Sequence, residues 1–566
     1  MRLPVQKSAN PPASPAGKVE PGEAFEATAV RELAEEAGLR SLPESVLLVG
    51  TLCDSTHGFT RVTEIARLTD YTGEPTVREP ELITRWEWHT PSALRCLPQP
   101  LFTASAQALN TVWPGLLPDV PPAHHTPRPA GDVALTFTES ATTVRLREQL
   151  VRHLTETGWT DTPELQRAFN AVPRHAFLPE QPHARTYANE AVATVFDETT
   201  GRSMSSVSQP EMQAIMLSRA GLRPGDNVLE IGGGYNASLI AELVGESGSV
   251  VCVEIDPYVH ARTERFLAET GYADRVRAVL GDGTHGAPGH LIPEKGFDAI
   301  IVTVAANDVP QRWTGQLAEG GHLVVPLRIG GFTRAVRLRR EGSVLVSTAI
   351  SACGFVPMQG AGRWDESPIL IGDTGYGIRW EDTSPVPLDG LDSALAAGGV
   401  ALWTGVTVRS GETFEDLQLW LATSLSQFCR MEGDPDRPGP VRLPKRSSAE
   451  AIVLGRSLAC LMTERREHDE AESTSLWEFG VQGFGPDGKA AADTLAAAVR
   501  AWDRELRNRA TPRLTVMPAG TPDSALPAGH VVEKPDRRIV VSWPGRDEAA
   551  GLAVGRNTTQ EGLDEQ

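Results

Sequence analysis

The sequence lacks the features of membrane, secreted and zinc-thiolate proteins. No run approaches the roughly 18 consecutive apolar residues that a membrane-spanning helix requires. The N-terminal segment MRLPVQKSANPPASPAG has no apolar core of a signal peptide. The six cysteines are scattered without a Cys-x-x-Cys spacing, so we expect free, mostly buried thiols and no zinc site. These absences predict a cytoplasmic protein without a membrane partner.

Positive charge is also scarce. The chain has 53 Lys and Arg residues against 73 Asp and Glu, which gives a formal net charge of −20. Binding to nucleic acid depends on Lys and Arg side chains that neutralise the phosphate backbone. The composition therefore predicts that nucleic acid is neither substrate nor partner. A GxxxxGK[ST] phosphate loop is missing as well, so the sequence does not indicate a nucleoside triphosphatase.

The length predicts several domains, because 566 residues exceed what one hydrophobic core usually organises. The stretch PGLLPDVPPAHHTPRPAGD is rich in proline and has no periodicity, which is typical of a linker. We predict an N-terminal domain at residues 1–117, a linker at 118–142, a second domain at 143–358 and a C-terminal region at 359–566.

The second domain alternates strand-like and helix-like segments. Expected strands are Val228–Ile231, Val250–Ile255, Ala299–Thr303 and His322–Pro326, and expected helices are Ser238–Leu243 and Tyr258–Thr270. This alternation predicts an α/β fold with a doubly wound, largely parallel sheet. The C-terminal region mixes strands such as Ala451–Leu454 and Arg538–Trp543 with one clear helix, Lys489–Asn508, and is therefore expected to be α+β.

Acidic residues and glycines stand at the ends of three consecutive elements of the second domain. Glu230 is followed by Gly232–Gly234, Glu254 ends the next strand, and Gly281-Asp282-Gly283 follows further on. Ligands of doubly wound sheets bind beyond the carboxyl ends of the strands, and an acid about 20 residues after a glycine turn can accept both ribose hydroxyls. Glycine lets the backbone approach a ligand closely. We expect Asn236 or Ser238 to begin the helix after the turn.

Several further motifs carry a family resemblance. They are Val172–Phe177 (VPRHAF), Ser208-Gln209-Pro210, Phe297–Ala306 (FDAIIVTVAA) and Leu317–Gly321 (LAEGG). With the glycine turns, they make the stretch from about Val144 to Phe355 resemble protein L-isoaspartate O-methyltransferases. The resemblance implies a Rossmann-like class I methyltransferase domain with S-adenosylmethionine as cofactor. The loop Gly232–Tyr235 is shorter than the usual glycine loop of that family.

The same resemblance assigns roles to individual residues. Ser208 falls on the family's active-site serine, near the carboxylate that accepts the methyl group. Glu254 would hold the ribose of the cofactor. The remaining assignments are Glu230, Gly232 and Gly234 at the methionine end, and Asp282 with Gly283 at the adenine.

The segments after this domain resemble a subfamily of these enzymes. WEFGVQGFGP, from Trp477, and VVEKPD, from Val531, look like the C-terminal extension of actinobacterial methyltransferases of the lanthipeptide FxLD and ATP-grasp types. That likeness implies methylation of an aspartate in a ribosomally made precursor peptide, on the way to aspartimide and isoaspartate. Repair of isoaspartyl residues in many proteins is the alternative. A Nudix pyrophosphohydrolase with an attached binding module is a further one.

The N-terminal domain carries a different motif. Gly17, Glu23 and the run RELAEEAGL from Arg31 match every defined position of the Nudix box. On a helix, Glu32, Glu35 and Glu36 share one face, and three adjacent carboxylates favour binding of a divalent cation such as Mg²⁺. Only 16 residues precede Gly17, whereas Nudix proteins have a strand-rich portion there. Either the start of the sequence is placed too late or the domain is a remnant that serves as a scaffold, and we favour a truncated Nudix domain with weak or absent hydrolase activity.

Overall fold

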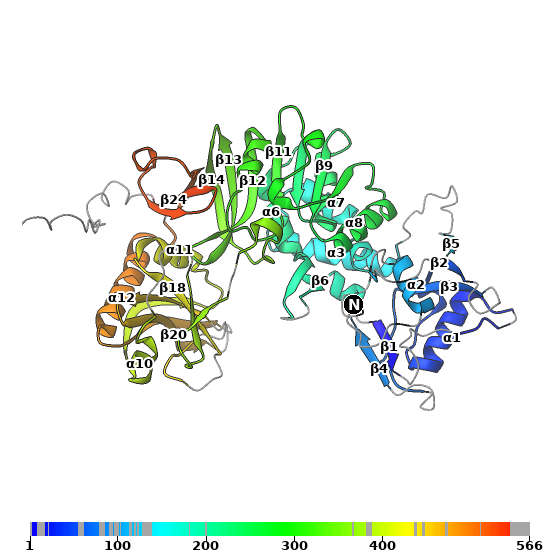
Figure 1. Ribbon diagram of the computed structural model, residues 1–566, viewed down its shortest axis with the longest axis horizontal. Helices are drawn as coiled ribbons and strands as arrows, with labels where there is room; N and C mark the ends of the chain where they lie inside the picture. Colours follow the sequence, from blue (N-terminus) through cyan, green and yellow to red (C-terminus); the bar gives the residue numbers. More distant parts are fainter. Residues whose placement is uncertain are drawn as a thin grey trace, which may run out of the picture. The chain divides into compact units, whose positions relative to one another are not determined.

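Two compact units make up the chain, residues 1–303 and residues 304–566 (Figure 1). The predicted linker at residues 118–142 lies mostly outside the described residues. The computed structural model describes residues 3–7, 17–20, 22–54, 61–78, 85–89, 94, 101, 103–112, 116–117, 120, 124–126, 139–179, 181–197, 201–364, 367–380, 388–434, 439–443, 448–469, 474–509 and 511–543.

The N-terminal domain combines two small sheets with two helices. Its elements are β1 (Leu3–Lys7), α1 (Phe25–Ala37), β2 (Val46–Asp54), β3 (Arg61–Leu68), β4 (Arg85–His89), α2 (Thr103–Val112) and β5 (His124–Thr126). Strand β1 pairs with β4, and β2 lies between β3 and β5. Helix α1 buries Leu33 and Ala37, and it ends where Gly38 adopts a left-handed conformation with φ of 68°. Because the apolar residues are on one face, the carboxylates of the Nudix box lie on the rest of the helix surface.

The rest of the first unit contains the parallel sheet that the sequence predicts. Its elements are α3 (Ala141–Glu156), α4 (Pro163–Ala171), α5 (His183–Thr186), β6 (Val192–Phe196), β7 (Ser203–Val207), α6 (Pro210–Ala220), β8 (Asn227–Ile231), α7 (Tyr235–Val244), β9 (Ser249–Glu254), α8 (Pro257–Glu269), β10 (Val276–Leu280) and β11 (Phe297–Val302). Strands β10, β9, β8 and β11 are neighbours in that order and run parallel. The order confirms the Rossmann-like methyltransferase fold.

Burial on both faces explains why these strands are almost wholly apolar. Val228 and Leu229 of β8 are fully buried, as are most residues of β9 and β11. Helix α7 packs against β8, β9 and β10, and α8 packs against β9 and β10. A parallel strand that is covered by helices on both faces has apolar residues throughout, instead of alternating apolar and polar residues. Asp256 caps α8 by accepting hydrogen bonds from the backbone N–H groups of Tyr258 and Val259, which fixes the turn directly after β9.

The second unit begins with an antiparallel sheet. Its elements are α9 (Gln311–Gln316), β12 (Leu317–Ile329), β13 (Phe332–Glu341), β14 (Val344–Ala352), β22 (Arg513–Pro518), β23 (His530–Glu533) and β24 (Arg537–Ser542), with the strands in the order β12-β13-β14-β22-β24-β23. Strand β14 pairs with β22 through Leu345 and Val516. Strands from the predicted C-terminal region therefore return to extend the sheet of β12–β14.

The remaining residues form a seven-stranded sheet with helices packed on it. Its order is β15 (Ile369–Leu370), β16 (Tyr376–Arg379), β18 (Phe428–Gly433), β19 (Ser448–Leu454), β20 (Ser457–Asp469), β21 (Thr474–Phe484) and β17 (Gly399–Arg409). The helices are α10 (Leu391–Ala396), α11 (Glu415–Ser424) and α12 (Gly488–Glu505). Helix α12 packs against β17, β20 and β21 and buries Leu495, Val499 and Trp502. These apolar residues form the stripe that the sequence predicts.

Two observations bear on the absences noted in the sequence. Among the described residues, no helix is both long and apolar enough to cross a membrane. Cys252, Cys353, Cys429 and Cys460 are free thiols, and all of them except Cys353 are buried.

Candidate active site

The predicted cofactor residues meet at the carboxyl ends of the parallel strands. The N–H of Gly232 donates to the carbonyl of Val253 at 2.9 Å, and the N–H of Gly281 donates to the carbonyl of Glu254 at 2.8 Å. The N–H of Thr303 donates to the carbonyl of Ile231, also at 2.8 Å. These bonds hold the loops after β8, β9, β10 and β11 along one edge of the sheet, where ligands of such folds bind.

The glycine loop requires glycine for two physical reasons. Gly232 and Gly234 have φ angles of 113° and 110°, which residues with a side chain rarely adopt. A Cβ atom on Gly232 would also lie 2.0 Å from Oγ1 of Thr303. The expectation that Asn236 or Ser238 begins the next helix is wrong, because α7 begins at Tyr235 with Gly234 as its N-cap.

Glu230 is a fully buried acid at the end of β8. Its Oε1 accepts a hydrogen bond of 2.7 Å from Nδ2 of Asn236, and its Oε2 has no hydrogen-bond partner among the described residues. Burial raises the pKa of Glu230 to about 8. A buried carboxyl with an unused oxygen can accept a hydrogen bond from a ligand, or stabilise a positive charge once it ionises.

Glu254 ends β9 next to the glycine loop. Its Oε1 accepts a hydrogen bond of 2.9 Å from the N–H of Asp256, and burial raises its pKa to about 7. A Cβ atom on Gly233 would lie 3.2 Å from Oε2 of Glu254, so the backbone of the loop runs close to this carboxylate. Glu254 is therefore placed beside the glycine loop, as the resemblance implies.

Asp282 follows β10, the strand that pairs with β9. Leu280 lies opposite Glu254 in that pair, so Asp282 stands two residues beyond the register position of Glu254. Oδ1 of Asp282 accepts a hydrogen bond of 2.8 Å from the N–H of Thr284 and caps a short 3-10 helix, η5 (Gly283–His285). Gly283 itself is buried.

These residues fit S-adenosylmethionine. Oε2 of Glu230 is buried without a hydrogen-bond partner among the described residues, and the backbone of the glycine loop runs so close to Glu254 that a Cβ added to Gly233 would lie 3.2 Å from its Oε2. Among the described residues, neither carboxylate forms an ion pair with Lys or Arg. Carboxylates that have no ion-pair partner in the protein can bind a ligand that carries a positive charge and donates hydrogen bonds from hydroxyl groups.

Ser208 lies between β7 and α6 and is partly exposed. Its carbonyl accepts a hydrogen bond of 2.9 Å from Nη2 of Arg174. Arg174 and Thr303 are contact residues to which the sequence reasoning gave no role, and Asn236 was expected only at the start of a helix. A cation within the apolar run VPRHAF was the available signal for Arg174. The hydrogen bond between Asn236 and Glu230 had no comparable signal.

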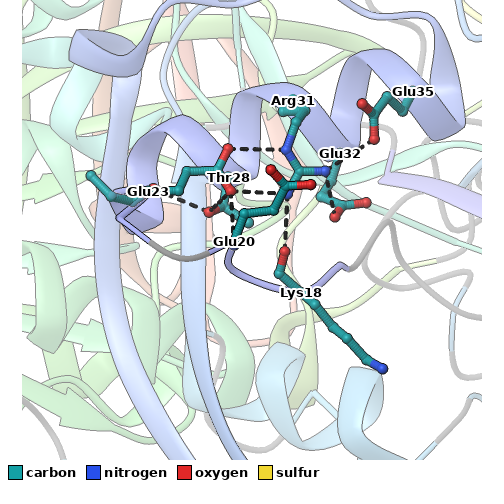
Figure 2. A network of polar contacts seen from close by, with 8 residues as sticks. Lys18, Glu20, Glu23, Thr28, Arg31, Glu32 and Glu35 are labelled. Atoms are coloured by element: carbon teal, nitrogen blue, oxygen red, sulfur yellow. Dashed lines mark hydrogen bonds and ion pairs between the residues drawn. The ribbon is translucent and has the colours of Figure 1, made fainter.

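The carboxylates of the Nudix box lie on or near α1, in the N-terminal domain. The cofactor loops belong to the domain with the parallel sheet. Figure 2 shows the Arg31 guanidinium among the carboxylates of the Nudix box. Arg31 contacts Glu23 at 3.0 Å, Glu32 at 2.9 Å and Glu35 at 3.0 Å. The hydrogen bond from Arg31 lowers the pKa of Glu23 to about 2. Among the described residues, no group of three or more possible ligands is arranged to hold a metal ion, so Mg²⁺ binding by Glu32, Glu35 and Glu36 stays a prediction.

Comparison with known proteins finds two family models that match separate parts of the chain. The model of the protein-L-isoaspartate(D-aspartate) O-methyltransferase family matches residues 145–362, and the NUDIX domain model matches residues 3–111. The protein-L-isoaspartate O-methyltransferase of Methanopyrus kandleri is 35% identical over 39% of this chain and 95% of its own length. That of Ignicoccus hospitalis is 36% identical over 38% of this chain and 96% of its own length. A solved structure of a protein-L-isoaspartate O-methyltransferase is 22% identical, with a TM-score of 0.36, over 65% of this chain and 96% of that one.

Proposed function

The chain belongs to the protein-L-isoaspartate(D-aspartate) O-methyltransferase family, and we propose that it methylates an aspartyl or isoaspartyl carboxylate of a ribosomally made peptide. Its enzyme class is that of the carboxyl O-methyltransferases, and its cofactor is S-adenosylmethionine. The class of reaction follows from the family, whereas the identity of the acceptor is our inference. Repair of isoaspartyl residues in many proteins is the alternative, and family membership is compatible with it.

The site residues have distinct roles in this proposal. When bound, S-adenosylmethionine supplies a methyl group activated on a positively charged sulfur. Glu254 accepts hydrogen bonds from the ribose hydroxyls. Glu230, Gly232 and Gly234 shape the methionine end, and Asp282 with Gly283 contacts the adenine. The unpaired, buried Oε2 of Glu230 supports these assignments.

Ser208 orients the acceptor carboxylate by hydrogen bonding. A carboxylate is already a nucleophile, so the protein mainly has to align it with the methyl group and exclude water. Ser208 would hold an acceptor oxygen in line with the activated methyl group that bound S-adenosylmethionine would supply. The next backbone nitrogen of the peptide can then attack the ester, which releases methanol and gives aspartimide.

The part of the chain outside the family domain supports a peptide acceptor. The relative from Methanopyrus kandleri is matched over 95% of its length by only 39% of this chain. The family model ends at residue 362, and the seven-stranded sheet of β15–β21 lies beyond that point. An additional folded region in the same chain offers further surface for selecting one acceptor. A repair enzyme acting on many proteins has no need of it.

The contacts of the β23–β24 turn carry this inference. Nζ of Lys534 donates to Oδ1 of Asn307 at 3.1 Å, and Nε of Arg537 donates to the carbonyl of Val309 at 2.9 Å. The Arg537 side chain is only 2% exposed, and its Nη2 also donates to Thr314. Asn307 and Val309 belong to the loop that leaves the carboxyl end of β11. The last strands of the chain thus hold residues 307–309, which follow β11 in the sequence.

The decisive experiment offers the full-length protein two acceptors. One is the cognate precursor peptide, found as a short gene beside a cyclising enzyme, and the other is a generic isoaspartyl peptide. We expect methylation of the precursor, seen by mass spectrometry as a gained methyl group or a net loss of water. Efficient methylation of only the generic peptide would establish repair instead. Absence of S-adenosylmethionine binding at millimolar concentration in calorimetry would contradict the methyltransferase assignment itself.

Neighbouring arginines of β24 provide a matched pair of variants. Arg537 holds the loop after β11, whereas Arg538 pairs with the exposed acids Glu533 and Asp523 and donates to the carbonyl of Thr521. We expect Arg537→Ala to lower kcat/KM for the precursor peptide by roughly tenfold or more, since a displaced loop misplaces the acceptor. Arg538→Ala should change it less than about twofold. Equal effects of the two variants on kcat/KM would remove the support that this loop gives to the proposal.

A further inference from the structure

Arg174 is a cation held in the interior by neutral acceptors. It lies at the start of the short 3-10 helix η4 (Arg174–Phe177) and is 0% exposed. Its Nε donates to the carbonyl of Thr186 at 2.9 Å, its Nη1 to Oε1 of Gln213 at 3.0 Å, and its Nη2 to the carbonyl of Ser208 at 2.9 Å. One guanidinium thus joins η4 to the end of α5, to α6 and to the segment that carries Ser208.

Its charge is not balanced by a nearby acid. Among the described residues Arg174 forms no ion pair, and its hydrogen-bond acceptors are carbonyl and amide oxygens. Burial lowers the pKa of Arg174 to about 10, so the side chain still carries its charge at neutral pH. A buried, unpaired cation is costly compared with an apolar residue of similar size. A purely packing role would not require this side chain.

The same guanidinium contacts the beginning of the helix after the cofactor loop. Cζ of Arg174 lies 5.1 Å from the centre of the Tyr235 ring, a cation–π distance. Tyr235 is fully buried and opens α7 directly after Gly234. Arg174 therefore lies between the segment of the predicted active-site serine and the segment of the predicted cofactor loop.

We infer that Arg174 is a positioning residue that fixes Ser208 relative to the glycine loop and so sets the alignment of acceptor carboxylate and methyl donor. This inference rests on the proposed role of Ser208. Misplacement of a reacting group by about 1 Å can cost about a hundredfold in rate, so a side chain that touches neither reactant can still control turnover.

Lysine cannot replace the guanidinium in this arrangement. The planar fork of arginine directs donors at several acceptors at once, whereas the lysine ammonium is a compact point charge. Arg174→Lys keeps the charge and most of the stem, so it tests the fork rather than the burial of an apolar group. Arg167→Lys is the matched control, because Arg167 is exposed on α4 and, within the described part of the chain, its ion pair is with the exposed Glu164.

The first measurement is steady-state methylation at saturating cofactor and peptide, well below the melting temperature. We expect Arg174→Lys to lower kcat by roughly 10- to 100-fold, with the Kd of S-adenosylmethionine changed less than about threefold. In a Ser208→Ala background the same substitution should lower kcat less than about threefold. Arg174 affects kcat by placing the Ser208 hydroxyl, and that hydroxyl is already absent in this background. Equal losses in both backgrounds, or an unchanged kcat, would overturn the inference. Arg167→Lys should leave kcat unchanged.

The second measurement does not depend on activity. Amide hydrogen exchange of the full-length protein should be faster in Arg174→Lys at residues 203–213, and unchanged in Arg167→Lys. Unchanged exchange at these residues would overturn the inference even for an inactive protein. If the native protein methylates neither acceptor, the proposed function fails, and the exchange result still decides whether Arg174 orders the Ser208 segment.

Discussion

Two groups of glutamates in this chain have opposite surroundings. In the Nudix box, Glu23, Glu32 and Glu35 lie around Arg31, which contacts all three. At the carboxyl ends of β8 and β9, Glu230 and Glu254 are held by an asparagine and by a backbone N–H. The pKa of Glu23 is lowered to about 2, whereas that of Glu230 is raised to about 8.

The difference shows which glutamates already have a positively charged partner within the protein. In the N-terminal domain the folded chain supplies its own cation, so an added cation has to compete with Arg31. At the cofactor edge the acids are desolvated, and no cation of the described residues pairs with them, which leaves them available for a ligand. The same residue type thus has a structural role in one region and a proposed binding role in the other.

The largest expected effect is on cofactor binding. Glu254→Ala should weaken S-adenosylmethionine binding by a few kcal/mol, roughly a hundredfold or more in Kd, since charge-assisted hydrogen bonds to the ribose are lost. Calorimetry on the purified variant measures this change. Glu35→Ala, which removes an acid of the other group, should leave the Kd unchanged. An unaltered Kd in Glu254→Ala would show that β9 does not carry the ribose acid.

The next effect is on stability as a function of pH. Because the pKa of Glu230 is raised from 4.5 to about 8, the folded chain binds a proton that the unfolded chain has lost between these values. The contribution to stability is full below about pH 4.5 and declines as pH rises towards 8. It amounts to on the order of a few kcal/mol. Urea unfolding at several pH values should show a smaller decline in Glu230→Gln, which cannot ionise.

Glu23 should show the reverse dependence. Its pKa is lowered from 4.5 to about 2, so its contribution is present above pH 4.5 and is lost as pH falls towards 2. Glu23→Gln should therefore flatten the acid side of the stability curve, whereas Glu230→Gln flattens the alkaline side. Two variants that flatten the same side would invalidate the contrast between the regions.

A smaller effect is expected from the glycines beside these acids. A Cβ on Gly232 would meet Thr303 at 2.0 Å where φ is +113°, and Thr303 Oγ1 already donates to the carbonyl of Ile231. A Cβ on Gly17 would meet only the movable end of the Glu32 side chain. Gly232→Ala should lower the free energy of unfolding by about 1–3 kcal/mol, and Gly17→Ala by less than about 0.5 kcal/mol. Denaturant titration of both variants tests whether Gly232→Ala lowers the free energy of unfolding more than Gly17→Ala does.

The smallest effect concerns the Nudix box. Because Arg31 contacts three of its acids, we expect Mg²⁺ at millimolar concentration to raise Tm by no more than about 1 °C. Hydrolysis of nucleoside diphosphate derivatives should be weak or absent. Arg31→Ala, which frees the carboxylates, should enlarge the response to Mg²⁺. Robust Mg²⁺-dependent turnover that Glu35→Gln abolishes would instead establish an active hydrolase.

Much of the cofactor edge could be predicted because its residues follow one another in sequence. Glu230, Glu254 and Asp282 each stand at or just past the end of an apolar strand, and parallel strands bring their carboxyl ends to one edge. The start of α7 was wrong because the usual preference for Asn or Ser at an N-cap was outweighed by Gly234 at positive φ. The Nudix acids were correctly placed on one helix, but the contacts of Arg31 with them were not foreseen.

The sequence by itself determined the order of the elements, the parallel sheet and the positions of the acids and glycines, because these depend on local periodicity and spacing. Only the tertiary structure decided which distant groups meet. Arg174 reaches Ser208, and Lys534 reaches Asn307. The pairing of β22 with β14 returns the end of the chain to an earlier sheet. Such contacts depend on the three-dimensional path of the chain, and no local propensity encodes them.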